Sequence, residues 1–196
     1  MSGKTQQPCD LAFSCHCGAV QGHITASGVK SGTHVACFCK DCRAAQLYFQ
    51  QPDPAPGPVD ILQTTPEDIV FESGADKLGL MQLSPKGMPR WYATCCNTPI
   101  ATTTRTPKFP FVGFLADRLR DPDKLGPVKV RGFVPGPGGK QSYQGVRHAI
   151  TGLLSRVVKS RLSGRWKDTP FFNIEAGTPV VPPVILSKEQ RTALYD

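Results

Sequence analysis

Seven of the eight cysteines in the chain fall into three short clusters. These clusters are Cys15-His16-Cys17, the CxCxxC segment of Cys37, Cys39 and Cys42, and the adjacent pair Cys95-Cys96. Thiolates this close in sequence can converge on one cation at little loop-closure cost, whereas disulfides usually join cysteines that are farther apart. Buried or disulfide-bonded cysteines are the alternative interpretation. The clustering favours metal ligation, and zinc is the metal that it predicts.

The first and third clusters together predict a closed structural zinc site. A structural zinc takes four protein ligands, which two pairs from distant segments can supply. The predicted ligands are Cys15, Cys17, Cys95 and Cys96. Such a site ties an early strand to the middle of the chain. Its binding energy is folding energy, on the order of 10 kcal/mol in small zinc peptides.

The second cluster predicts an open zinc site with a catalytic role. Cys37, Cys39 and Cys42 supply three thiolates from one turn and leave one coordination position free, as is typical of a zinc that acts on a substrate. An open zinc can capture a thiolate or polarise a carbonyl oxygen, and both suit the addition of a thiol to an aldehyde. In the alternative interpretation, water, His34 or Cys9 closes the fourth position and the site is inert.

The composition predicts a mainly β chain of one domain with an appendage. The chain has 196 residues, of which 39% are hydrophobic, and its nineteen glycines and nineteen prolines exclude long helices from most of it. Short β-prone segments lie between these breaks. We expect strands at residues 19–25, 33–38, 59–63, 69–71, 77–83, 90–94, 100–104, 111–115 and 128–134.

The pattern changes after a glycine and proline break at residues 135–139. From Tyr143 to Leu162, apolar residues recur at spacings of three and four, and most cations lie off that stripe, which predicts a basic amphipathic helix. Ser187 and Gln190 form a capping box for a last short helix. We therefore predict a zinc-binding β domain over residues 1–135 and a basic helical extension, packed on it, over residues 136–196.

Charge and hydropathy restrict the partners. The net charge is +8, and residues 118–167 hold twelve cations against two acidic residues. Such a block can attract nucleic acid, an acidic membrane surface or a small anionic substrate, although it is most often a solvated face. We expect no membrane partner, because no apolar stretch approaches the roughly 20 residues that span a bilayer. The early residues carry no secretory signal, so we expect a reducing, cytoplasmic location.

Three motifs in order carry a family resemblance: Cys15-His16-Cys17-Gly18-Ala19-Val20, then Cys37 to Arg43, then Arg90 to Ile100. With them the chain resembles, over about residues 10–115, the glutathione-dependent formaldehyde-activating enzymes, a family that includes centromere protein V. The resemblance implies an Mss4-like fold of twisted antiparallel sheets. It also implies one structural zinc, a three-cysteine zinc near a glutathione pocket, and the conversion of glutathione and formaldehyde to S-hydroxymethylglutathione.

The resemblance assigns most of the cysteines. Its structural ligands match Cys15, Cys17 and Cys96, and its reactive ligands match Cys37, Cys39 and Cys42. The family's other structural cysteine is Ala93 here, so Cys95 is the expected substitute, and the family's glycine is Asn97, which tolerates a left-handed turn. The segment Ala44-Ala45-Gln46-Leu47 replaces another glycine-containing stretch.

Two functions follow from these observations. The first is a zinc-dependent carbon-sulfur lyase-like enzyme for a small thiol such as glutathione, with Arg43 or the basic region attracting its carboxylates. The alternative is a non-catalytic zinc-binding module whose basic C-terminal region binds nucleic acid or an acidic partner.

Overall fold

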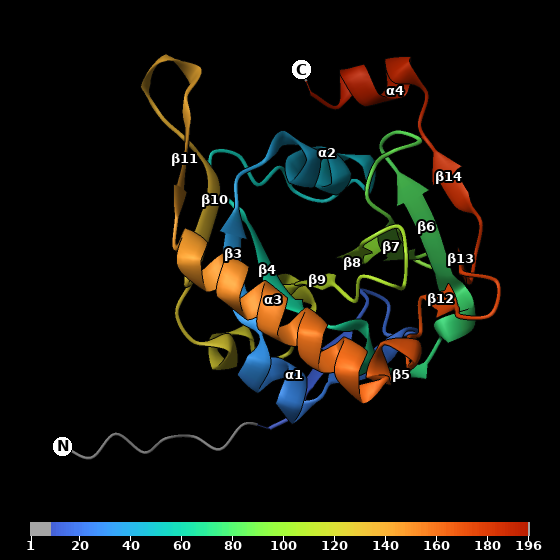
Figure 1. The fold of residues 1–196 in the computed structure, drawn as a ribbon. Helices are drawn as coiled ribbons and strands as arrows, with labels where there is room; N and C mark the ends of the chain where they lie inside the picture. Colours follow the sequence, from blue (N-terminus) through green and yellow to red (C-terminus); the bar gives the residue numbers. More distant parts are fainter. Residues whose placement is uncertain (1–8, 196) are drawn as a thin grey trace.

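The computed structural model describes residues 9–195, and most of its regular structure is β-sheet (Figure 1). A small antiparallel sheet has the order β1-β2-β5, formed by Leu11–Ser14, Gln21–Ile24 and Ile69–Ser73. A larger sheet has the order β11-β10-β3-β4-β9-β8-β7-β6-β14. Its strands are β3 (Thr33–Cys37), β4 (Val59–Thr64), β6 (Leu78–Gln82), β7 (Arg90–Ala93), β8 (Thr98–Thr103), β9 (Val112–Leu115), β10 (Val130–Pro135), β11 (Gln141–Gln144) and β14 (Pro183–Ile185).

A short hairpin and the helices complete the fold. The hairpin pairs β12 (Phe172–Asn173) with β13 (Thr178–Pro179). The α-helices are α1 (Ala26–Ser31), α2 (Lys40–Tyr48), α3 (Val146–Ser163) and α4 (Lys188–Ala193). In Figure 1, α3 crosses the outside of the sheet in front of β3, and α4 lies near α2. None of the helices within the described residues is long and apolar enough to cross a membrane.

The prediction of a mainly β fold is confirmed, with one correction to the sheets. The expected sheets were antiparallel, but the large sheet is mixed, because β10 runs parallel to β3 and β14 runs parallel to β6. Both parallel partners come from later parts of the chain, after long connections, as parallel pairing requires. Each expected strand is present, with bounds that differ by a few residues.

An aromatic cluster fills the main core. Trp91 of β7 is fully buried, and its indole Nε1 donates a 3.0 Å hydrogen bond to the Thr103 hydroxyl. The ring of Phe171 lies 5.0 Å from that of Trp91, and Phe13 lies 4.7 Å from Phe114. Burial of such side chains supplies about 1.5–3 kcal/mol each. The core therefore joins the small sheet, the large sheet and the chain around Phe171.

The chain after residue 135 is more than a helical appendage. It supplies both edge strands of the large sheet, β11 and β14, and it buries Phe171 and Phe172 in the main core. The capping box predicted at Ser187 and Gln190 is present at the start of α4. Strands thus accompany the basic helix in the expected extension, and a domain boundary at residue 135 stays a prediction.

The amphipathic helix forms, three residues later than expected, but it does not bury its apolar stripe. Leu153 and Val157 are half-buried, whereas most of the stripe is exposed. The buried side chains of α3 are Arg156 and Ser160, which lie off that stripe. The helix takes this orientation because the Arg156 guanidinium donates hydrogen bonds to Ser31 and Thr33, just before and at the start of β3.

Candidate metal centres

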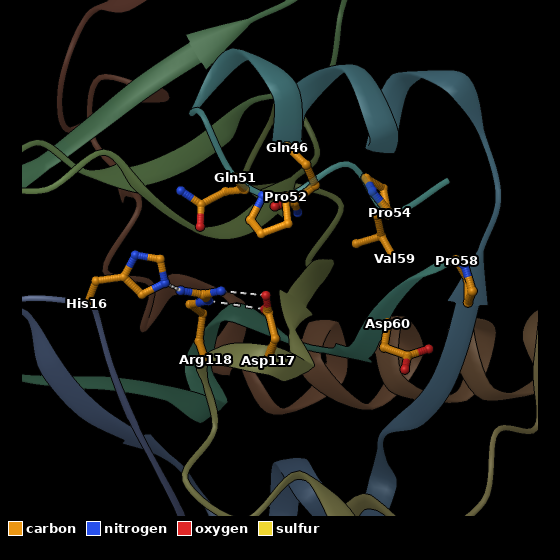
Figure 2. A pocket seen from close by; sticks show the side chains of 10 residues that line it. All are labelled: His16, Gln46, Gln51, Pro52, Pro54, Pro58, Val59, Asp60, Asp117 and Arg118. Carbon is orange, nitrogen blue, oxygen red and sulfur yellow. Dashed lines mark hydrogen bonds and ion pairs between the residues drawn. The ribbon is translucent and has the colours of Figure 1, made fainter. Parts of the chain in front are cut away.

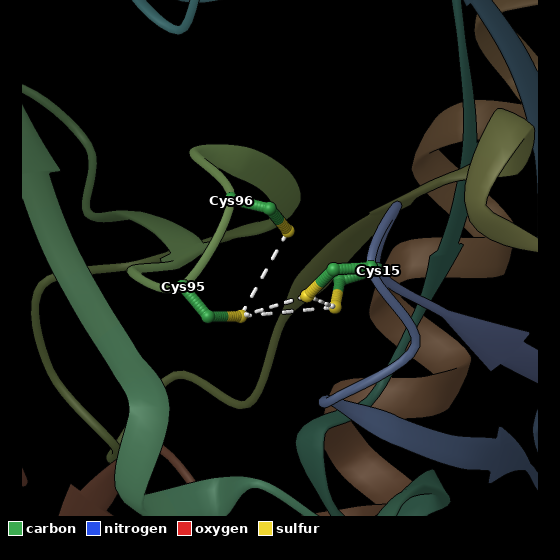
Figure 3. Close-up of side chains that lie close together, drawn as sticks. Cys15, Cys95 and Cys96 are labelled. Carbon is green, nitrogen blue, oxygen red and sulfur yellow. Dashed lines mark hydrogen bonds between the residues drawn. The ribbon is translucent and has the colours of Figure 1, made fainter.

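The structure brings the four predicted structural ligands together. Their sulfur atoms all lie within 4.8 Å of one another. Cys17 Sγ is 3.4 Å from Cys95 Sγ. In Figure 3, the side chains of Cys15 and Cys96 point toward that of Cys95, with their Sγ atoms 3.9 Å and 3.8 Å from Cys95 Sγ. Four sulfurs around a zinc at about 2.3 Å are about 3.8 Å apart, so the spacing fits tetrahedral ligation. These cysteines are free thiols without disulfides, and the cluster could hold a metal ion.

Two turns position this four-cysteine cluster. The first follows β1, where Gly18 has a φ of 76° and the backbone N–H of Val20 donates a 3.3 Å hydrogen bond to Cys15 Sγ. The second joins β7 to β8 and contains Cys95 and Cys96. Asn97 has a φ of 50° in that turn, as predicted from its tolerance of the left-handed region. The cluster therefore links the small sheet to the large sheet.

Neighbouring polar groups act on Cys96 in this cluster. Its sulfur lies 3.0 Å from the Thr98 hydroxyl. Burial raises the pKa of Cys96, but the hydrogen bonds from Thr98 and Cys17 outweigh burial and lower that pKa to about 6. The thiolate is the form that binds metals. The cluster thus contains a sulfur that is ready for ligation near neutral pH.

The three-cysteine cluster forms where β3 passes into α2. Cys37 ends β3, Cys39 caps the N-terminus of α2, and Cys42 lies in the first turn of that helix. The three sulfurs lie within 4.8 Å of one another, and this cluster could also hold a metal ion. The Cys39 sulfur accepts a 3.3 Å hydrogen bond from the backbone N–H of Cys42. A helix N-terminus favours negative charge, so it stabilises thiolates at this position.

The three sulfurs of this cluster differ in pKa because they hydrogen-bond to one another. Hydrogen bonds from Cys37 and Cys42, together with the positive charge of Arg90, lower the pKa of Cys39 to about 2. The hydrogen bond between Cys37 and Cys39 raises the pKa of Cys37 to about 11. The hydrogen bonds from Cys42 to Cys37 and Cys39, with burial, raise the pKa of Cys42 well above its usual range. Negative charge thus concentrates on the capping cysteine.

A cavity of about 420 Å³ opens beside the three-cysteine cluster, and all three of its cysteines line the wall. The remaining wall combines apolar and polar side chains. It is formed by Lys40, Asp41, Ile61, Gln63, Met88, Arg90, Thr102, Phe111, Gly113, Phe133 and Gln141. Such a mixed lining suits a small organic ligand with a few polar groups. The four-cysteine cluster contributes no side chain to this cavity.

Arg90 supplies a buried positive charge in this cavity. The residue is only 9% exposed and begins β7, and within residues 9–195 it forms no ion pair. Its positive charge acts on the sulfurs of Cys39 and Cys42, whose thiolate forms it favours, and charge-assisted hydrogen bonds would also let it hold an anionic group of a ligand in the cavity. Sequence analysis missed Arg90, because only the pairing of β7 with its neighbours brings residue 90 beside Cys42.

Arg43 faces a different environment. Its guanidinium forms a bidentate ion pair with Asp53, with Nη2 2.8 Å from Oδ2 and Nε 2.9 Å from Oδ1. This pair lowers the pKa of Asp53 to about 2. Arg43 lines a neighbouring cavity of about 270 Å³, together with Cys37, Cys39 and the proline-rich loop of residues 51–58. The ion pair therefore tethers that loop to α2.

The C-terminal end of the described chain lies on the first turn of α2. The Tyr195 hydroxyl donates a 2.7 Å hydrogen bond to Asp41, and the Lys40 ammonium lies 4.7 Å from the Tyr195 ring centroid. Burial and the bond to Asp41 raise the pKa of Tyr195 to about 12. Because Lys40 and Asp41 also line the cavity beside the three-cysteine cluster, the C-terminal segment braces one side of that site.

A third cavity, of about 430 Å³, lies near the four-cysteine cluster (Figure 2). His16 points into it from the turn after β1, and its Nε2 contacts the Arg118 guanidinium. Arg118 also pairs with Asp117. These polar groups satisfy one another, so they hold the turn that carries Cys15 and Cys17.

The alternative ligands for the fourth position do not join the three-cysteine cluster. Cys9 and His34 are absent from the groups of metal-binding side chains found among residues 9–195. The His34 Nδ1 lies 2.8 Å from the Gly126 carbonyl oxygen instead. The described part of the chain therefore offers three side-chain ligands at this site.

The chain belongs to a protein family without an assigned function. The chain is a member of DUF6151, a family of unknown function, whose profile matches residues 9–181. A crystal structure of a Rhodobacter sphaeroides protein is similar at 22% identity, with a TM-score of 0.42, over 60% of this chain and 96% of that one. No curated protein matches the chain.

Proposed function

We propose that the protein is a zinc-dependent carbon-sulfur lyase-like enzyme that acts on a small thiol and an aldehyde. The observation that carries the proposal is that Cys37, Cys39 and Cys42 all line a cavity of about 420 Å³, with no fourth side-chain ligand among the described residues. Structural zinc sites have four protein ligands, as in the four-cysteine cluster, whereas catalytic zinc sites have three and an open position, as in the three-cysteine cluster. The four-cysteine cluster holds the fold together.

The motif resemblance supports the same proposal. The ordered cysteine motifs of the glutathione-dependent formaldehyde-activating enzymes fall here on residues that converge in space. Cys95 lies with Cys15, Cys17 and Cys96, which supports it as the substitute for the family cysteine at Ala93. We propose zinc as the metal at both clusters and an Mss4-like arrangement for the sheets around them.

The proposed reaction adds a thiol to formaldehyde. The sulfur forms a bond to the carbonyl carbon, the carbonyl double bond becomes a single bond, and the thiol proton ends on the carbonyl oxygen, without oxidation or reduction. A zinc ion in the three-cysteine site would favour the thiolate form and polarise the carbonyl oxygen. The residues Cys37, Cys39 and Cys42 would hold that ion beside the cavity.

Arg90 fits the role of a carboxylate anchor for the thiol substrate. It is buried in the cavity wall and forms no ion pair among the described residues, whereas Arg43 is already occupied by Asp53. Glutathione carries two carboxylates, and charge-assisted hydrogen bonds to arginine orient such groups. Ile61 and Phe111 form an apolar part of the same wall, against which the uncharged part of the substrate would pack.

Exchange spectroscopy tests the proposal directly. Two-dimensional NMR measures the exchange between free glutathione and S-hydroxymethylglutathione with and without the zinc-loaded protein. We expect the protein to accelerate this exchange and the Cys42→Ser variant to lose the acceleration, while Cys9→Ser, which alters an exposed cysteine outside both clusters, keeps it. Equal exchange rates with and without the protein would contradict the proposal.

A non-catalytic module that binds nucleic acid has less support. Its basic region, residues 118–167, contains few aromatic side chains, and these contact one another or cations of the same region. The rings of Phe133 and Tyr143 lie 5.0 Å apart, and the Arg161 guanidinium lies 4.4 Å from the Trp166 ring. Phe133 and Tyr143 are 38% and 52% exposed, but their rings pack on each other, which leaves fewer free ring faces for base stacking.

A further inference from the structure

We propose that the outward face of α3 binds the surface of a lipid bilayer that contains anionic phospholipid. Five apolar side chains on this helix are between 46% and 84% exposed. They are Val146, Ile150, Leu154, Val158 and Leu162, and they recur at every fourth position. Side chains spaced in this way share one side of a helix, so they form a single apolar band along α3. We call this set the α3 stripe.

The interior contacts of α3 keep the stripe outside. The Arg156 Nη1 donates hydrogen bonds of 2.8 Å to the Ser31 carbonyl oxygen and 2.9 Å to the Thr33 hydroxyl. Gly152 faces the same way, since a Cβ there would lie 2.9 Å from the Thr33 hydroxyl oxygen. Ser160 is buried one turn farther on. A rotation that buried the stripe would break these contacts and bring Arg156 to the surface.

The charge around the stripe selects an anionic partner. Residues 146–167 contain no aspartate or glutamate. The exposed cations along this segment and its next turn are Arg147, Lys159, Arg161, Arg165 and Lys167, of which Arg165 already pairs with the buried Asp68 at 3.6 Å. A second copy of the chain would place like charges against each other, because its α3 is equally basic. An apolar band with basic flanks and no acidic residue is the pattern of a helix that lies in the headgroup region of a bilayer.

The residues at the end of α3 favour a lipid surface as the partner over other anionic partners. Trp166 follows α3 and lies under the side chains of Arg161 and Lys167, whose cationic groups are 4.4 Å and 5.9 Å from its ring. Tryptophan is enriched at membrane–water interfaces, at the level of the lipid headgroups. A nucleic acid backbone, by contrast, offers nothing that buries the apolar α3 stripe.

The geometry is that of surface binding. An 18-residue helix is about 27 Å long, and α3 runs along the outside of the molecule (Figure 1), so its length can lie parallel to a membrane plane. The expectation of no membrane partner rested on the lack of a spanning segment, and surface binding needs none. The inference is independent of the proposed chemistry at the cysteines.

Vesicle sedimentation tests the inference with the whole protein. One set of vesicles is phosphatidylcholine, and the other contains about one third phosphatidylserine. We expect the protein to sediment with the anionic vesicles alone and to be released as salt is added. The double variant Ile150→Ser/Leu154→Ser should bind about tenfold more weakly or worse. The matched control Val180→Ser/Val184→Ser changes two valines, 49% and 50% exposed, outside α3 and should bind as the wild type does.

Tryptophan fluorescence gives a second measurement of the same event. The chain has two tryptophans, and Trp91 is fully buried. Anionic vesicles should therefore shift the emission of Trp166 to shorter wavelength, and the Trp166→Phe variant should lose the shift. Circular dichroism of each variant checks that it is folded, so that weak binding reports the surface.

Three results would overturn the inference. One is an absence of binding to anionic vesicles by the folded wild type. The second is equal binding by the wild type and the α3 stripe variant. The third is a wild-type dimer in sedimentation velocity that Ile150→Ser/Leu154→Ser converts to a monomer, which would make the α3 stripe an interface between copies of the chain.

Discussion

The sulfur atoms of Cys17 and Cys95 lie 3.4 Å apart although the residues are 78 positions apart in the sequence. Cys17 belongs to the turn after β1, and Cys95 belongs to the turn between β7 and β8. A metal ion at this point would fix the small sheet against the large one. The binding free energy of that ion would then offset the free-energy cost of bringing the two turns together.

Replacement of Cys95 should destabilise the whole fold. We expect Cys95→Ser to lose one zinc per chain and to lower the free energy of unfolding by about 3 kcal/mol or more. For a chain of this length, that corresponds to a fall in Tm of about 6–12 °C. Thermal unfolding with parallel zinc analysis measures both effects. The control Cys9→Ser changes another exposed cysteine, and an equal Tm for both variants would contradict the structural role.

Replacement of Arg90 should weaken the binding of carboxylate thiols. The Arg90→Gln variant removes the cavity's buried guanidinium, so we expect its Kd for glutathione to rise about tenfold to a hundredfold, with little change for the neutral thiol 2-mercaptoethanol. Titration calorimetry measures both ligands without requiring turnover. The comparison variant is Arg43→Gln, which removes the partner of Asp53. A larger effect from Arg43→Gln would make Arg43 the anchor.

Asn97 should tolerate glycine but not a β-branched residue. Its φ of 50° lies in the left-handed region, which costs most residues about 1–2 kcal/mol. Chemical denaturation of Asn97→Val should show a loss of this size, whereas Asn97→Gly should stay within about 0.5 kcal/mol of the wild type. Equal stability of the two variants would show that the turn between β7 and β8 adopts another conformation.

The phenol of Tyr195 should ionise later than a free tyrosine. Its hydrogen bond to Asp41 and its burial raise its pKa to about 12. Because the pKa is higher in the folded state than in the unfolded state, the contact stabilises the fold fully at pH values below about 10, the pKa of an unfolded tyrosine. That stabilisation is lost as the pH rises from about 10 towards 12. An absorption titration of tyrosinate in the wild type and in Tyr195→Phe isolates the group. Ionisation of Tyr195 at its ordinary pKa would show that the C-terminal segment is undocked.

The local features of this chain were predictable from sequence. Short β-prone segments bounded by glycine and proline formed strands, and the capping box at Ser187 formed the start of α4. The two cysteine groups also converged as predicted, because the spacing within each cluster restricts where its thiols can lie. The helix α3 begins three residues after its predicted start. It was predictable because apolar residues recur at spacings of three and four over many residues.

Features that depend on long-range contacts were not predictable in the same way. The polar strand β11 forms because β10 lies beside it, and Arg90 enters the cavity because strand pairing places it there. The orientation of α3 depends on hydrogen bonds from Arg156 to Ser31 and Thr33, more than 120 residues earlier. Periodicity identifies an apolar stripe, but it does not say whether that stripe faces the core.

Zinc per chain, before and after exposure to a mild chelator, tests the central claim most directly. We predict two zinc ions per chain in the intact protein, one of which the chelator removes from Cys37, Cys39 and Cys42 while the fold persists. The Cys42→Ser variant should then contain one zinc, which resists the chelator. A single tightly held zinc in the wild type would contradict the account, because the three-cysteine site would hold no metal.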